Sequence, residues 1–360
     1  MAFGNFHGKP FDEGTLTKLD IFQLYTREWL PVFLSRPARL GFEIHLFDYF
    51  AGPGRDPTGS PGSPLRTLQE LHRYSKSGLA GWTGTKIEVH FFDASKRKIK
   101  TLKNEVALSG LLPAGVIPDI QSMKFSEAFA RSREQLRSSN SAKLLLIDQC
   151  GVDTVTAEVF QELVSFPRTD FLFFISSATL NRFRNHPAIK QRIRRVDDYY
   201  QVHRVVLEFY REHLPSHRRY YLAPFSIKKG PNIYGIIFGS AHPLGVDKFL
   251  SVAWGKDQLN GEADFDIHHD ELDPREEMLP LGDVVRPTKV TAFERALENG
   301  IRTGRIRNEL EAMELCFAHG VTRQHAKPVL RQLKDERVIE ADFQVPSVDR
   351  INSPRPLRLL

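Results

Sequence analysis

The sequence predicts an α/β protein built on a doubly wound parallel sheet. Apolar runs recur along the first half of the chain, amphipathic segments fill the gaps between them, and a glycine-containing turn follows the first run directly. Several runs are nearly continuous in apolar residues, as expected for central parallel strands that are covered on both faces. The five runs are residues 42–50, 86–94, 115–120, 142–150 and 169–177.

The segments between these runs carry apolar residues at helical spacing. They are residues 64–76, 95–110, 126–139 and 154–166. In the second of them, Ser95 stands at an N-cap position and Gly110 marks the end. Strand and helix therefore alternate, which is typical of a doubly wound sheet.

The later part of the chain predicts an appended hairpin and a separate small domain. Residues 202–214 indicate a helix, and residues 220–229 and 232–242 indicate two antiparallel strands joined at Gly230. The chain then becomes acidic and rich in proline. We therefore expect a Rossmann-like domain over residues 1–259, a linker over 260–289 and a C-terminal domain over 290–360.

Composition sets limits on the class of protein. With 360 residues, 41% of them hydrophobic and 26% charged, the chain can bury one large core and a small second one. Cys150 and Cys316 are far apart, which disfavours a disulfide framework or a cysteine-based metal cluster. No apolar stretch reaches the length of about 20 residues that a membrane span needs, and no export signal is visible. We expect a soluble, cytoplasmic protein that does not contact a membrane, and its charge of +6 slightly favours a polyanionic partner.

Several short segments together resemble one family of bacterial proteins. They are TLTKLDIFQLYTREWLP (15–31), DYFAGPG (48–54), GSPGSPL (59–65), FFDAS (91–95), IDQCG (147–151) and YGIIFGSAHPLGVDKF (234–249). With these segments the chain is similar to the three-Cys-motif partner (TcmP) family, over roughly residues 9–340. The resemblance implies a class I methyltransferase-like fold, S-adenosylmethionine as cofactor, and a partner protein that carries three cysteines.

One motif departs from the pattern of that family. The family has Asp-Pro-aromatic-Gly after its fourth strand, where amino methyltransferases hold the target nitrogen. This chain has Asp148-Gln149-Cys150-Gly151, without the proline and the aromatic residue. Asp148 ends an apolar strand, so it could accept from a substrate N–H or act as a general base. Alternatively, it caps the next helix or balances a nearby lysine.

The turn DYFAGPG is interpreted as a cofactor-binding turn. S-adenosylmethionine carries a cationic sulfonium and an amino acid end, which suit a carboxylate beside glycines that admit a close backbone approach. Asp48 would face that end of the cofactor, and Gly52 and Gly54 would let the chain pass against it. Phe50 and Ala51, which lie between Asp48 and Gly52, are also candidates for contact with the cofactor. The alternative is a purely structural tight turn.

Two further acidic residues are candidates for contacts with the nucleoside. Asp93 closes the second predicted strand, where nucleotide-binding sheets place an acid for the ribose hydroxyls. The alternative is that Asp93 only caps the helix that begins near Ser95. Asp119, near the end of the third predicted strand, is a weaker candidate for contact with adenine, since it could simply belong to a strand edge.

The basic segments could contact nucleic acid, whereas the histidines do not predict a metal site. Residues 181–195 combine basic side chains with Phe183, and Arg182 and Arg184 are candidates for phosphate contacts. A solvated helix face is the alternative for this and the other basic segments. The histidines at 268 and 269 lie in the acidic linker without a defined ligand geometry, so no metal site is predicted.

The C-terminal seventy residues predict a winged helix, with a recognition helix that begins near Thr322 as its cap. Four side chains of this helix would point outward and could contact nucleic acid: Arg323, Gln324, Lys327 and Arg331. Basic and acidic residues nearly balance in this segment, and many winged helices bind proteins instead.

Two hypotheses about function follow. The first is a methyltransferase that uses S-adenosylmethionine and acts on nucleic acid, or with the three-cysteine partner. The second is a methyltransferase-like fold without chemistry, which binds DNA or a partner through the winged helix. A nucleotide hydrolase is disfavoured, because the sequence has neither a phosphate-binding loop nor an acidic metal motif.

Overall fold

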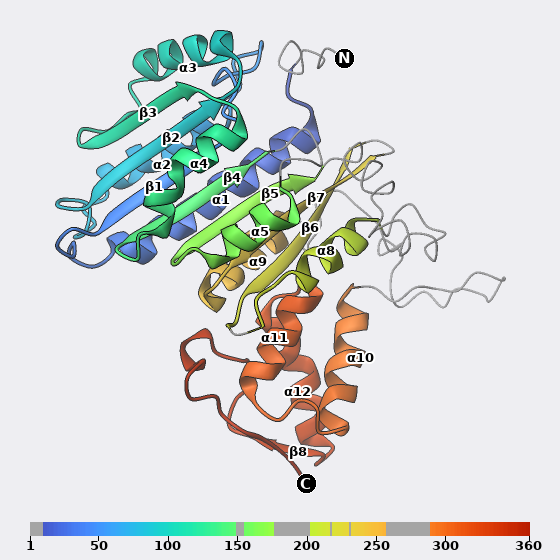
Figure 1. The fold of residues 1–360 in the computed structure, drawn as a ribbon. Helices are drawn as coiled ribbons and strands as arrows, with labels where there is room; N and C mark the ends of the chain where they lie inside the picture. Colours follow the sequence, from blue (N-terminus) through green and yellow to red (C-terminus); the bar gives the residue numbers. More distant parts are fainter. Residues whose placement is uncertain (1–9, 149–154, 176–201, 217, 230–231, 257–288) are drawn as a thin grey trace. The chain divides into compact units, whose positions relative to one another are not determined.

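The computed structural model describes residues 10–148, 155–175, 202–216, 218–229, 232–256 and 289–360 (Figure 1). The chain divides into two compact units. The first comprises residues 1–220 and 227–241, and the second comprises residues 221–226 and 242–360. Residues 260–288 of the predicted linker lie outside the described residues, so the domain boundaries at 259 and 290 stay a prediction.

A mostly parallel sheet of seven strands confirms the predicted α/β class. Its order is β3-β2-β1-β4-β5-β7-β6, and β7 runs antiparallel to β5. The strands are β1 (Glu43–Asp48), β2 (Lys86–Asp93), β3 (Val116–Ser122), β4 (Ser141–Ile147), β5 (Thr169–Ile175), β6 (Tyr221–Lys229) and β7 (Asn232–Ser240). The order reverses between β1 and β4, and ligands of such sheets bind beside this point at the carboxyl ends of the strands.

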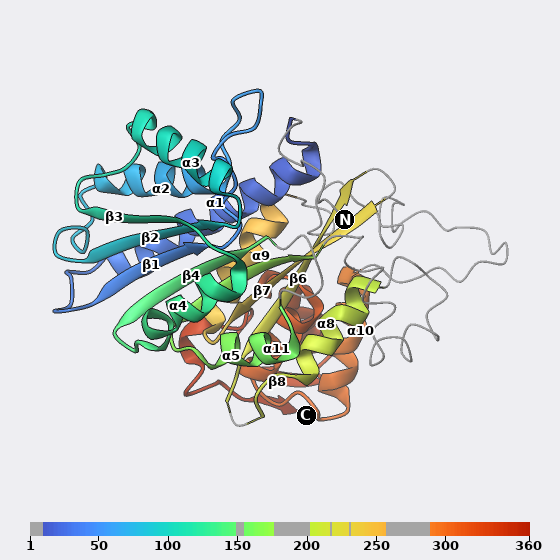
Figure 2. The same cartoon turned by 45° about the horizontal axis from the view of Figure 1, so that its top comes forward.

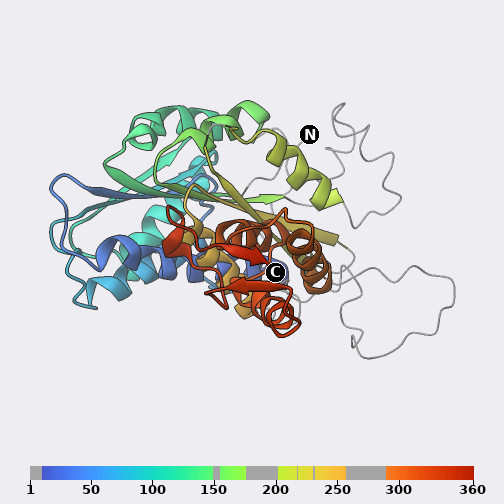
Figure 3. The ribbon, with the colours of Figure 1, turned by 90° about the horizontal axis from the view of Figure 1, so that it is seen from below.

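Helices cover both faces of the sheet. Figures 2 and 3 show α1 and α2 on one face and α4, α5 and α8 on the other. The helices of this unit within the described ranges are α1 (Glu13–Leu34), α2 (Ser63–Ser75), α3 (Lys96–Ser109), α4 (Phe125–Arg137), α5 (Ala157–Ser165) and α8 (Val202–Glu212). Covering on two sides explains why every residue of β4 is buried and why its sequence is continuously apolar from Leu144 to Ile147.

Polar contacts inside the first unit anchor α1 to the rest. The Tyr25 hydroxyl donates to Asp170 at 2.7 Å, and burial raises the pKa of Asp170 to about 6. Arg27 donates to both oxygens of the buried Glu70 on α2, at 2.9 and 2.8 Å. These contacts hold α1 in register against α2 and β5, which matters because α1 also carries a residue of the candidate site.

In the part that the structure describes, the second unit contains four α-helices, two short 3-10 helices and a small antiparallel sheet. Its elements are α9 (Pro243–Lys256), α10 (Lys289–Arg302), α11 (Glu309–His319), η3 (Arg323–His325), α12 (Ala326–Asp335), β8 (Ile339–Ala341), η4 (Val348–Arg350) and β9 (Leu357–Leu359). The indole N–H of Trp254 donates to the Gly320 carbonyl at 3.1 Å. The carboxylate of Glu309, buried in this unit, receives the Arg355 guanidinium at 2.7 Å. None of the helices in the described ranges combines the length and apolar content needed to cross a bilayer.

The structure corrects two expectations about the start of the last helix. Thr322 stands before η3, but its hydroxyl lies 2.8 Å from His325 Nδ1 and makes no capping bond to the backbone. Arg323 does not point outward. Its guanidinium makes two bonds to Asp247 of α9, at 2.7 and 2.8 Å, and also donates to the Pro346 carbonyl. Gln324, Lys327 and Arg331 are exposed, beside the exposed side chains of Pro328, Gln332, Asp335 and Glu336.

Replacing Arg323 with alanine should destabilise the second unit by about 2 kcal/mol, because it leaves Asp247 partly buried and without its main partner. Thermal or urea unfolding would measure the change. The matched control is Arg331→Ala on the same segment, where an exposed pair with Asp335 at 3.8 Å should change the free energy of unfolding by less than about 0.5 kcal/mol. Equal effects of the two substitutions would show that the Arg323 pair does not hold this unit together.

Candidate functional site

Asp48 is the central residue of the candidate site. It ends β1 and is only 2% exposed. One carboxylate oxygen, Oδ1, accepts from the Phe50 N–H at 3.0 Å, whereas Oδ2 finds no hydrogen-bond partner among the described residues. Burial raises its pKa to about 7, opposed by the Ser63 hydroxyl and the Phe50 N–H and reinforced by the charges of Asp148 and Asp93. A buried oxygen of this kind is costly unless a ligand satisfies it.

The glycine turn passes directly beside this carboxylate. Gly52 and Gly54 have φ values of 65° and 95°, which favour glycine. A Cβ on Gly54 would also lie 3.0 Å from the Leu102 side chain of α3. The Gly52 N–H donates to Asp93 Oδ2 at 3.2 Å. The turn therefore places backbone without bulky side chains at the end of the sheet, and its hydrogen bond to Asp93 connects it to β2.

Asp93 ends β2 and connects two segments. Its Oδ1 accepts from the Ser95 N–H at 2.8 Å, and its Oδ2 accepts from Gly52 and lies 3.6 Å from Lys98 Nζ. The carboxylate thus supports both the glycine turn and the residue before α3, while the helix cap itself is Ser95 and not Asp93. Its contact with a ribose stays a prediction.

Asp148 directly follows β4 and pairs with a residue that the sequence did not single out. Lys18 of α1 forms an ion pair with Asp148 Oδ2, and the same ammonium lies 4.6 Å from the centre of the Phe174 ring. The Lys18 side chain is 11% exposed. A lysine placed among the buried apolar positions of a helix is the signal that could have identified it. The predicted alternative, in which a lysine balances Asp148, describes the arrangement found, while residues 149–151 lie outside the described residues.

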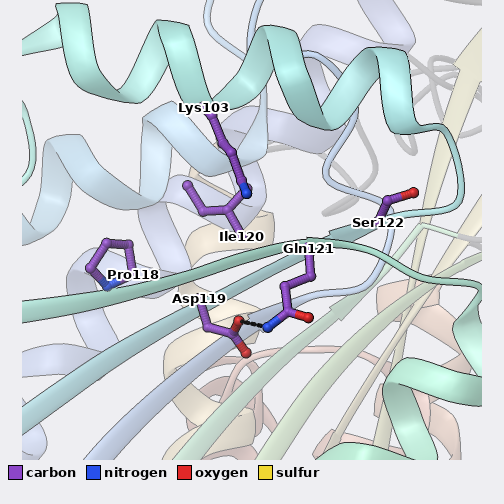
Figure 4. A pocket seen from close by; sticks show the side chains of 6 residues that line it. All are labelled: Lys103, Pro118, Asp119, Ile120, Gln121 and Ser122. Carbon is purple, nitrogen blue, oxygen red and sulfur yellow. Dashed lines mark hydrogen bonds between the residues drawn. The ribbon is translucent and has the colours of Figure 1, made fainter.

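Asp119 does not lie at the carboxyl end of its strand. β3 continues to Ser122, which pairs with Asp93, whereas Asp119 pairs in register with His90, about 10 Å earlier. Asp119 and Gln121 are hydrogen bonded on one side of β3, and Lys103 and Ile120 lie on the other side. All four residues line the recess shown in Figure 4. Asp119 therefore lies in the middle of β3 and not near its carboxyl end, because the strand is longer than its apolar run, and its contact with adenine stays a prediction.

The sheet brings part of the predicted site together and leaves part of it elsewhere. One edge of the first unit collects Asp48, Phe50, Ala51, Gly52, Gly54, Asp93 and Asp148. Gln324, Lys327 and Arg331 belong to the second unit, where Lys327 and Arg331 line a recess along α12. Arg182 and Arg184 lie outside the described residues, and their predicted contacts stay predictions.

The arrangement suits a ligand with a positive charge. Three carboxylates from adjacent strands gather at one edge. Asp148 pairs with Lys18 and Asp93 lies 3.6 Å from Lys98, whereas Asp48 pairs with no cation among the described residues. The ammonium and sulfonium groups of S-adenosylmethionine fit Asp48 Oδ2, which has no hydrogen-bond partner among the described residues, and the glycine turn leaves room for a close approach. The residues present therefore fit this cofactor.

Comparisons with known proteins give likenesses of fold at low identity. No family model matches the chain, and no curated protein matches it. Among solved structures, a SAM-dependent methyltransferase from Agrobacterium tumefaciens is 12% identical, with a TM-score of 0.35 over 64% of this chain and 62% of that one. A putative O-methyltransferase from Klebsiella pneumoniae is 11% identical, with a TM-score of 0.33 over 64% and 90% of the two chains.

A spermidine synthase from Thermotoga maritima is also similar, at 13% identity and a TM-score of 0.30 over 61% of this chain and 60% of that one. The Agrobacterium and Thermotoga structures thus match over less than two thirds of their own length. The strand order and the antiparallel β7, rather than these scores, identify the fold. The first unit of this chain has a methyltransferase-like α/β fold.

Proposed function

We propose that this protein is a methyltransferase of the TcmP type that uses S-adenosylmethionine, and that it acts on nucleic acid or together with a three-cysteine partner. The observation that carries the proposal is the buried Asp48 oxygen, which finds no hydrogen-bond partner among the described residues and lies beside a turn that needs glycine at Gly52 and Gly54. In a methyltransferase-like sheet this is the position at which the cofactor binds.

Each residue of the edge has a definite task in this proposal. Asp48 binds the cationic end of the cofactor, and Asp93 holds the ribose hydroxyls while it supports the turn. The cofactor, when bound, supplies an electrophilic methyl group. Asp148 accepts a hydrogen bond or a proton from the substrate, and Lys18 fixes the position of that carboxylate. Positioning is the main requirement of methyl transfer, so no catalytic triad is needed.

Calorimetric titration with S-adenosylmethionine and S-adenosylhomocysteine tests the proposal. We expect micromolar binding, weakened at least about 10-fold by Asp93→Ala, since a hydrogen-bonded ribose and the support of the turn are lost together. Glu162→Ala on α5 is the control, because this carboxylate pairs with Arg133 away from the edge, and it should leave the affinity unchanged. No heat of binding at millimolar cofactor would contradict the proposal.

A second candidate is a binding protein that keeps the fold without the chemistry. Its support is the ion pair of Asp148 with Lys18, together with the missing proline and aromatic residue in the sequence after β4. Cofactor binding without methyl transfer to any nucleic acid or partner tested would favour this candidate.

The proposed contact with nucleic acid rests on the second unit. Three helices, α10 to α12, precede the small β8–β9 sheet, which is the order of a winged helix. Gln324, Lys327 and Arg331 lie on the exposed side of its last helical segment. We propose this side as the surface that contacts nucleic acid or the partner. A salt-dependent affinity for DNA would indicate phosphate contacts, and its absence would favour a protein partner.

A further inference from the structure

A second cluster of polar side chains lies on the sheet away from the candidate cofactor edge. His45 of β1 lies opposite Glu88 of β2 in the parallel register, and His90 follows two residues later on the same face. Asp48 projects from the other face of β1, because side chains alternate along a strand. His45 is 1% exposed and His90 5% exposed. Three metal-ligating groups thus meet inside the fold, separate from the site already described.

The ligand atoms of this cluster are spaced as around a tetrahedral ion. His45 Nδ1 lies 3.1 Å from His90 Nε2, and Glu88 Oε2 lies 3.4 Å from each of these nitrogens. Zinc binds nitrogen and carboxylate oxygen at about 2.0–2.1 Å, which places two ligands of a tetrahedron about 3.3–3.4 Å apart. The three distances match this triangle closely, so an ion could be bound with little rearrangement.

A carboxylate also lies beside the remaining nitrogen of each imidazole. Glu43 Oε2 lies 3.0 Å from His45 Nε2, and Asp119 Oδ2 lies 3.4 Å from His90 Nδ1. Such pairs determine which nitrogen carries the proton and leave the other free to bind a metal. This accounts for the position of Asp119 in the middle of β3, which the cofactor edge does not explain.

The charges around the cluster are compatible with a cation. Lys86 Nζ pairs with Glu88 Oε1 at 2.7 Å and with Glu43 Oε1 at 3.1 Å, which leaves Glu88 Oε2 facing the two histidines. Arg131 of α4 lies 3.2 Å from Asp119.

We propose that His45, Glu88 and His90 bind a divalent ion of the zinc class, supported by Glu43 and Asp119. Two imidazoles and one carboxylate match the preferences of zinc better than those of magnesium or calcium, which favour all-oxygen sites. The ion would join β1 to β2 and stabilise the sheet. Three protein ligands leave a fourth position, and Glu88, with 15% of its side chain exposed, is the ligand nearest to solvent.

The test uses the full, untagged chain after removal of metal with a chelator. Titration with zinc sulfate should show one equivalent bound and a higher melting temperature, and cobalt should give the intense visible bands of a four-coordinate site. Asp119→Asn, a mild change, should weaken zinc binding about 10- to 100-fold through His90. His72→Ala on α2 is the matched histidine control and should bind zinc as the wild type does.

His90→Ala should abolish binding and the cobalt bands. Circular dichroism would show whether this variant folds, and Glu88→Gln, which keeps the size of the side chain, provides a second ligand variant. The proposal would be overturned if the metal-free protein bound no zinc at about 100 μM, an ion concentration far above that which zinc sites need. It would also be overturned if the two ligand variants and Asp119→Asn bound zinc as tightly as the wild type. Neither result depends on cofactor binding.

Discussion

Replacing Asp48 with asparagine should abolish binding of S-adenosylmethionine while making the protein more stable above neutral pH. The carboxylate is buried, its Oδ2 finds no hydrogen-bond partner in the described part of the chain, and burial raises its pKa to about 7. Ionisation of this group therefore lowers the free energy of unfolding of the free protein, and binding of a cation offsets this loss. An uncharged amide removes both the cost and the attraction.

The pH dependence has a defined sign. Because the pKa of Asp48 in the folded protein lies above the ordinary value of 3.8, the folded state holds the proton more tightly than the unfolded state. Stability from this group is complete below the ordinary value and is lost as pH rises towards about 7. The shift corresponds to an upper limit of about 4 kcal/mol. Cofactor affinity should change in the opposite direction and rise with pH through this range, since the ligand needs the carboxylate.

Urea unfolding and calorimetric titration at about pH 5 and pH 8 would measure both effects. At the higher pH we expect Asp48→Asn to be more stable than the wild type by about 2 kcal/mol, less than the limit because the new amide N–H also lacks a partner. Affinity for the cofactor should fall at least about 100-fold, because the substitution removes one buried contact between opposite charges.

Asp56→Asn is a control of opposite sign in the same loop. The Asp56 carboxylate accepts from the N–H groups of Phe11, Thr58 and Ser60, which lower its pKa. Its neutralisation should therefore destabilise the protein. If both substitutions lowered stability at the higher pH, Asp48 would be an ordinary structural residue, and the case for a cation site at this edge would be lost.

Substitution of Gly239 by alanine should destabilise the first unit by about 3 kcal/mol or more, at the upper end of what overpacking of a core costs. Gly239 of β7 lies directly opposite Phe171 of β5 in the antiparallel pair. A Cβ at this position would lie 2.2 Å from the end of the Phe171 ring. The ring cannot move aside easily, because it is fully buried and contacts Phe173 and Tyr220.

Gly255→Ala is the matched control for this effect. Gly255 lies in α9, where its backbone is helical, and a Cβ added there would point into open space, with no atom of another segment within 4 Å among the described residues. Alanine there should stabilise the protein by about 0.5–1 kcal/mol, since glycine is a poor helix former. Thermal unfolding would separate the two, at about 2–4 °C per kcal/mol for a domain of this size. A melting temperature of Gly239→Ala close to that of the wild type would show that β5 and β7 are packed less tightly than described.

Local chemistry was enough to predict most elements of the first unit. The helix α3 begins after Ser95, whose hydroxyl accepts from the Lys98 N–H, and ends at Gly110 with φ of 64°, as the sequence predicted. Both features depend on residues within one helical turn. The continuous apolar runs likewise predicted parallel strands, because a strand that is buried on both faces shows no alternation of polar and apolar residues. The DYFAGPG turn was also visible from its glycines alone.

The partners of the polar side chains were decided only by the tertiary structure. Lys18 meets Asp148 across 130 residues of chain, Arg323 meets Asp247 across 76, and His45 meets His90 across 45. Each pair depends on strand register or on which helix packs against which, and neither is encoded in local spacing. The sequence by itself therefore determined where strands, caps and the glycine turn form, whereas folding decided which charges are neutralised, where Asp119 lies and which groups could hold an ion.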